Sequence, residues 1–141
     1  MQASVRKRKE KKMKNSILCL IAALFISSAS GITFNCNFHD FDWPDFGRIY
    51  ICEVTLFADL TNSNLTSVTG THQNEMSNLD VKGVWISFAV NLPFIPQGIH
   101  HFFPNFYTMS IISSSIETLS GSELNDYVNL EAFILADTKL G

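Results

Sequence analysis

The sequence predicts an α/β, β-rich solenoid in which a short parallel sheet follows an N-terminal cap. The main observation is an apolar pattern that restarts at residues 81, 106 and 130, a period of about 24–25 residues. Positions 4 and 6 of each unit share one face of a strand, because side chains alternate along a strand. A secretory N-terminus and two later cysteines complete the prediction. The apolar sets at positions 1, 4 and 6 are Val81, Val84 and Ile86; Phe106, Met109 and Ile111; and Leu130, Phe133 and Leu135.

The N-terminus has the three parts of a secretory signal. Residues 1–14 are strongly basic, residues 15–30 are uncharged with an apolar centre at 17–26, and Ser28-Ala29-Ser30-Gly31 offers small residues for cleavage. We therefore expect residues 1–30 to be a cleavable signal peptide and the protein to be secreted. An uncleaved signal anchor at the cell surface is the alternative, and translation starts at Met1 or Met13.

The rest of the chain is acidic. From residue 31 onward it has three Lys and Arg against twelve Asp and Glu, and three minus twelve gives a charge of about −9. Such a surface repels phosphate backbones, so we expect no nucleic-acid partner. We also expect no membrane span in the mature body.

Cysteine usage agrees with secretion. Cys19 lies in the apolar centre of the signal, so Cys36 and Cys52 are the pair left in the body. An even count in a secreted protein predicts one disulfide, two free buried thiols being the alternative. Asn64-Leu65-Thr66 is a glycosylation sequon and predicts a glycan on Asn64 if that site is used.

Residues 31–80 are expected to form the cap. We predict irregular structure over 31–46, a strand over 48–56 where β-branched residues are frequent, and a short strand over 65–68. The repeats then occupy 81–141, and the third unit is cut short at the end of the sequence. An uncapped last unit would expose apolar side chains and favour self-association.

Four stretches carry a family resemblance: Tyr50-Ile51-Cys52-Glu53-Val54, Gly70-Thr71-His72, Asn78-Leu79-Asp80-Val81 and Ile99-His100-His101-Phe102-Phe103-Pro104-Asn105-Phe106. With the repeats, they resemble the extracellular leucine-rich-repeat family. The N-terminal part is similar to the capping region of arthropod secreted and cell-surface members. The resemblance implies a binding module without catalysis or cofactor, which recognises a protein or a glycan through a concave sheet.

The resemblance also defines a candidate binding face. Outward strand positions of such repeats line the concave surface, with Trp85 and Phe88 the leading contacts. The alternative is that the cap or a loop covers these two aromatic side chains. The candidate face comprises Trp85, Ser87, Phe88, Ser110, Ile112 and Ile134.

The sequence departs from the family at position 9 of each unit, where the family has an asparagine that binds the turn backbone. This chain has Ala89, Ser114 and Thr138 there. We expect the two hydroxyls to replace the amide in part, and Ala89 not to. The small number of units suggests a fragment or a truncated, non-functional copy.

No motif predicts a catalytic or metal site. His100 and His101 are adjacent and lack further ligands at a suitable spacing. His39 with Asp40, Asp42 and Asp45 is best explained as a solvated acidic loop, and Gly70-Thr71-His72 as a structural turn in which His72 caps a backbone group. We therefore expect no enzyme activity, cofactor or metal.

A second hypothesis is a small secreted carrier of apolar ligands. It predicts an enclosed cavity, whereas the repeat hypothesis predicts a parallel ladder at positions 4 to 6 of each unit. The aromatic residues that would line the carrier's cavity are Phe38, Phe41, Trp43, Phe46, Phe102 and Phe103.

Overall fold

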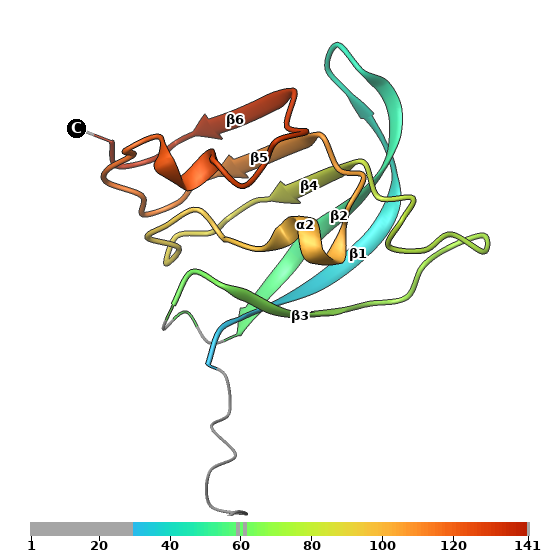
Figure 1. Ribbon diagram of the computed structural model, residues 1–141, viewed down its shortest axis with the longest axis horizontal. Helices are drawn as coiled ribbons and strands as arrows, with labels where there is room; N and C mark the ends of the chain where they lie inside the picture. The colour runs from blue at the N-terminus through green and yellow to red at the C-terminus, as the bar shows by residue number, and fades with distance from the viewer. Residues whose placement is uncertain (1–29, 59, 61, 141) are drawn as a thin grey trace, which may run out of the picture.

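The computed structural model describes residues 30–58, 60 and 62–140, so the predicted signal peptide lies outside the described residues except for Ser30. Six strands form one mixed sheet in the order β3-β1-β2-β4-β5-β6 (Figure 1). Among the described residues, no helix is long and apolar enough to cross a membrane. The elements are β1 (Ile32–Trp43), β2 (Gly47–Ala58), β3 (Leu65–Thr69), β4 (Gly83–Ile86), α2 (Ile99–Phe102), β5 (Thr108–Ile112), the 3-10 turn η1 (Ser122–Leu124) and β6 (Ala132–Ala136).

Strands β4, β5 and β6 form a parallel ladder in the register that the apolar period requires. Val84 lies opposite Met109, and Met109 lies opposite Phe133. Two residues further along, Ile86, Ile111 and Leu135 are aligned in the same way. The predicted strands and their alignment are therefore confirmed. Each unit contributes one strand, and equivalent positions of successive units lie side by side.

The turns after these strands repeat as well. Relative position 8 of each unit has a left-handed backbone, with φ of 55° at Phe88, 58° at Ser113 and 51° at Asp137. Few non-glycine residues adopt a positive φ, so its recurrence at one position is informative. The hydrogen bonds between units also repeat: the N–H of Tyr107 donates to the carbonyl of Lys82 at 2.9 Å, and the N–H of Glu131 donates to that of Tyr107 at 2.7 Å.

Strands β1 and β2 form a long antiparallel hairpin, so the expectation of irregular structure over 31–46 is wrong. β1 runs for 12 residues and pairs with β2 along its length, with one register shift between Asn35 and Cys36. The strand forms because Phe34, Cys36 and Phe38 alternate toward the core, and it ends at Trp43, where residues 44–46 make a tight turn that begins with Pro44. The predicted strands over 48–56 and 65–68 are confirmed as β2 and β3.

The predicted disulfide is present and joins the two strands of this hairpin. Cys36 and Cys52 are bonded, with their Cα atoms 5.1 Å apart and a sequence separation of 16. A crosslink that closes a loop of about 15 residues contributes about 3 kcal/mol through the unfolded state. The bond therefore holds β1 on β2 at the point where the register shifts.

The main core lies on one face of the sheet, which we call the core face. There Val84, Ile86, Met109 and Ile111 pack against the segments that return the chain from one strand to the next. Phe103 and Tyr127, three residues before two of the unit starts, are both buried in this core. The returning residues include Leu92, Ile95, Ile99, Phe103, Ile116 and Tyr127.

Candidate functional site

The opposite face of the sheet, which we call the cleft face, carries a second apolar cluster. Trp43, Ile49 and Ile51 are buried there, and Phe41, Phe46, Trp85 and Tyr107 pack against them. These residues lie on this face because alternate side chains of a strand point to opposite sides.

The hairpin of β1 and β2 rises beside the starting ends of β4, β5 and β6 (Figure 1). Its tip is held by Phe46, whose ring centroid lies 5.4 Å from that of Tyr107. Gly83 lets the hairpin come close, because a Cβ at this position would lie only 3.1 Å from the Trp43 ring.

A small apolar cleft lies between the hairpin and the strands, and we call it the hairpin cleft. It is lined by Phe41, Trp43 and Pro44 from the hairpin and by Trp85, Ser110, Ile112 and Ile134 from the strands, with a volume of about 170 Å³. The Phe41 and Trp85 rings meet edge to face with centroids 4.4 Å apart, and Trp43 lies 6.5 Å from Trp85. Such aromatic pairs add to the stability of a buried cluster and here form one wall of the cleft.

The structure divides the predicted binding face into two parts. Trp85, Ser110, Ile112 and Ile134 line the hairpin cleft. Phe88 and Ser87 instead line a separate hollow of about 450 Å³ beside the ends of β2 and β4. The two leading aromatic residues therefore do not share a site.

Trp85 and Phe88 also differ in exposure. Trp85 is half-buried and its indole nitrogen is buried without a hydrogen-bond partner in the described part of the chain. Phe88 is 85% exposed because the left-handed turn points it away from the core. The alternative, that the cap or a loop covers both residues, therefore holds in part for Trp85 and does not hold for Phe88.

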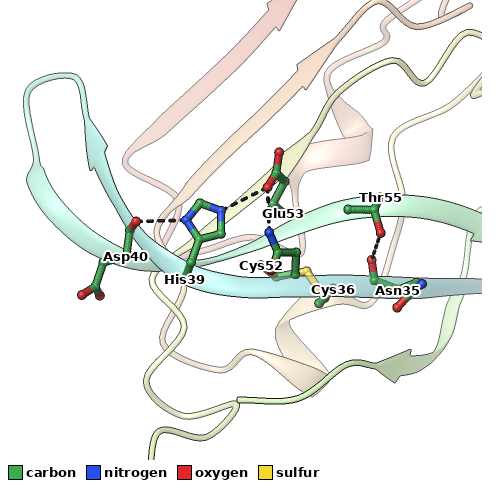
Figure 2. Close-up of polar contacts among 8 residues, drawn as sticks. Asn35, Cys36, His39, Asp40, Cys52, Glu53 and Thr55 are labelled. Carbon is green, nitrogen blue, oxygen red and sulfur yellow. Dashed lines mark hydrogen bonds and ion pairs between the residues drawn. A yellow bond between two sulfur atoms is a disulfide. The ribbon is translucent and has the colours of Figure 1, made fainter. Parts of the chain in front are cut away.

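A polar group lies on the cleft face next to this site (Figure 2). The Nε2 atom of His39 is 3.1 Å from the Glu53 carboxylate, which also accepts a hydrogen bond from the Asn37 amide at 3.2 Å. The Nδ1 atom of His39 is 2.9 Å from the carbonyl of Asp40. Both neighbours of the imidazole are hydrogen-bond acceptors. Glu53 is opposite Trp85 in the sheet, so this polar group adjoins the cleft.

The other acidic residues of the hairpin differ in their partners. Arg48 pairs with Asp40 at 3.2 Å across the hairpin. Asp42 and Asp45 are exposed and make no ion pair within the described residues. On the other side of the cleft, exposed Glu131 and Asp137 stand just before and just after β6. Acidic side chains thus occur on both elements that border the cleft.

His72 has a structural position, but the partners differ from those expected. Its ring stacks on Phe38 with centroids 3.8 Å apart, and it binds the Tyr50 hydroxyl at 3.2 Å and the Asn78 amide oxygen at 2.8 Å. Both hydrogen bonds go to side chains, so the expected cap on a backbone group is wrong. The Tyr50 hydroxyl makes the backbone contact instead, because it accepts from the N–H of Gln73 at 3.1 Å.

The expected replacement of the position-9 asparagine holds for one residue of two. Thr138 accepts a hydrogen bond from the N–H of Leu140 at 3.4 Å. Ser114 is buried, and its hydroxyl has no partner in the part of the chain that the structure describes. Ala89 is buried and offers no polar group. The turns therefore depend on backbone hydrogen bonds between units, such as Ser115 N–H to the carbonyl of Leu92 at 3.1 Å.

The remaining sequence candidates are the histidine pair and the glycosylation sequon. The described residues contain no group of three or more His, Cys, Asp or Glu that could hold a metal ion. The ring centroids of the adjacent His100 and His101 lie 4.0 Å apart. Asn64 is exposed at the start of β3, where a glycan could be accommodated.

The aromatic residues proposed to line a carrier's cavity are divided between the two faces. Phe38, Phe102 and Phe103 pack in the main core, whereas Phe41, Trp43 and Phe46 pack on the cleft face. Sequence reasoning missed that Phe41 and Trp43, with Pro44, face Trp85, and that Phe46 packs against Tyr107. The alternation of Phe41 and Trp43 in the sequence was the available signal, since it places both rings on one side of a strand.

The described residues supply a mixed six-stranded sheet, a disulfide-bonded hairpin and an apolar cleft between them. No protein-family model, no curated protein and no solved structure matches this chain.

Proposed function

We propose that this protein is a secreted or cell-surface binding module of the leucine-rich-repeat type that recognises a protein or glycan partner without catalysis. The observation that carries the proposal is the half-buried apolar lining of the hairpin cleft. Ile134 is 38% exposed on this face, and Trp85 and Ile112 are only partly covered. Exposed apolar side chains gathered at one place commonly mark a partner site, and aromatic residues are favoured anchors.

The repeat assignment is supported by three features that recur together. The apolar positions are aligned in a parallel ladder, position 8 has the same left-handed backbone in three units, and backbone hydrogen bonds repeat from unit to unit. Sheet strands that each contact their sequence neighbours are typical of solenoids. The disulfide is consistent with an oxidising, extracellular compartment.

The proposal is tested on an array of extracellular proteins and glycans, probed with the wild type and with Ile134→Glu. Ile134 is a better probe than Trp85, because Trp85 also packs against Phe41 and its loss would disturb the hairpin. Val128→Glu is the matched control, since Val128 is 86% exposed and does not line the hairpin cleft. We expect at least one array member to bind the wild type and the control but not Ile134→Glu. Equal binding of all three proteins, or binding by none, would contradict the proposal.

A further inference from the structure

We propose that the hairpin cleft receives one large apolar side chain of a protein partner, and that basic residues on either side of it in the partner segment meet the acidic borders of the cleft. This inference rests on the proposed binding function and names the partner class of the same site.

The size of the cleft indicates a single side chain. Sites for drug-sized ligands have volumes of about 300–1,000 Å³, and the hairpin cleft has about 170 Å³. A lipid or another extended apolar ligand would not be enclosed. A leucine, methionine or phenylalanine side chain of a partner can enter the cleft from the solvent. Single large side chains bind in this way in peptide-recognition pockets.

The lining favours an apolar side chain over a sugar. Six of the seven lining residues are aromatic, proline or isoleucine, and the exception is Ser110. The one polar residue of the lining is Ser110, whereas the Trp85 indole N–H is buried without a partner among the described residues. A sugar ring would bring several hydroxyls into contact with this lining, and buried hydroxyls without partners cost free energy.

The charges around the cleft favour basic neighbours for that side chain. The turn of the hairpin carries Asp45, next to the lining residue Pro44 and without an ion pair among the described residues, and β6 is bordered by exposed Glu131 and Asp137. A complementary potential steers binding and fixes its register. A second copy of this chain is disfavoured as the partner, because residues 31–141 have three basic against twelve acidic side chains and two such bodies repel.

The experiment selects binders from a random-peptide library displayed on phage, with the protein expressed from its full coding sequence in a secreting host. Expected is a consensus with one large apolar residue flanked by Lys or Arg, enriched on the wild type and on Val128→Glu but not on Ile134→Glu. A synthetic peptide of that consensus should bind Asp45→Asn and Glu131→Gln each roughly two- to fivefold more weakly at low salt. Added salt should reduce this difference, because exposed charges are screened.

Three results would overturn the inference. The first is that no peptide is enriched on the wild type more than on Ile134→Glu. The second is an apolar consensus without basic residues, and the third is a basic consensus without an apolar anchor. The protein and glycan array shows whether a negative peptide result rejects only the apolar-anchor inference or also the proposed binding function. A glycan that binds wild type but not Ile134→Glu would leave the binding function standing and reject the protein partner, whereas an array without any Ile134-dependent binder would reject both. Melting curves of Ile134→Glu establish that the variant is folded.

Discussion

Replacement of Gly83 by alanine tests how the hairpin is held against the strands. A Cβ at this position would lie 2.7 Å from the Thr108 hydroxyl oxygen, 2.9 Å from a methyl of Ile51 and 3.1 Å from the Trp43 ring. Ile51 and Thr108 are fully buried and Trp43 is 4% exposed, so these neighbours have little room to move. The added methyl group must therefore push the hairpin away from β4.

The expected loss of stability follows from two opposing effects. Forcing a methyl group into a well-packed site costs about 1–3 kcal/mol. Alanine offsets about 0.4–1 kcal/mol of this, because it reduces the conformational freedom of the unfolded chain. We expect Gly83→Ala to lower the free energy of unfolding by about 1–2 kcal/mol, which corresponds to a fall in Tm of roughly 5–10 °C.

Urea unfolding followed by tryptophan fluorescence measures this loss, since Trp43 and Trp85 both lie at the affected contact. Thr108→Ala removes the closest neighbour, at the cost of the 3.3 Å hydrogen bond from Thr108 to the carbonyl of Lys82. A double-mutant cycle subtracts that cost. We expect the double variant to lose at least about 0.5 kcal/mol less free energy of unfolding than the two single variants lose together. An unchanged or raised stability of Gly83→Ala, or strict additivity, would refute the reasoning.

Three further predictions concern covalent and ionisable groups. Non-reducing mass spectrometry should detect a Cys36–Cys52 peptide, and replacing both cysteines by serine should lower the free energy of unfolding by about 3 kcal/mol; two alkylatable thiols in the folded protein would contradict this. Burial raises the pKa of the Tyr127 hydroxyl above its usual value of 10.0, so stability is fully present below that pH and is lost as pH rises above it. Urea midpoints should therefore fall above about pH 10 in the wild type and fall less in Tyr127→Phe; parallel curves would exclude the tyrosine as the cause. The hydroxyl and N–H of Ser77 hold the pKa of Asp80 below its ordinary 3.8, so this carboxylate stabilises the fold above that pH and the effect is lost as pH falls through the lowered pKa. Asp80→Asn should flatten the acid limb of the stability curve, and an unchanged limb would mean that Asp80 is not responsible.

The hairpin shows where sequence reasoning failed. Residues 31–46 were expected to be irregular because aromatic and acidic residues are mixed there, yet Ile32–Trp43 is a continuous strand. The acids Asp40 and Asp42 are exposed and pair with Tyr50 and Arg48, beyond the part of β2 that pairs with β4, so they do not disturb a core. Local composition could not show this, because the strand is stabilised by pairing with β2 and by the disulfide.

The sequence by itself determined the alignment of β4, β5 and β6. A period of about 24–25 residues with apolar positions 4 and 6 permits one register in which every unit buries the same face, since a shift by one residue would turn that face to solvent. It also determined the cysteine pair, because Cys36 and Cys52 are the two cysteines of the described chain.

Only the tertiary structure decided which outward residues form a site. Trp85, Ser110, Ile112 and Ile134 had been identified from their strand positions, but the other wall of the cleft comes from Phe41, Trp43 and Pro44, more than 35 residues away in the chain. Phe88 does not line the cleft, because its backbone has a left-handed φ of 55° that directs the side chain elsewhere. A phenylalanine residue does not by itself predict this backbone conformation. The physical reason is the same in both cases: strand periodicity specifies the face a side chain points to, whereas long-range packing specifies what lies opposite it.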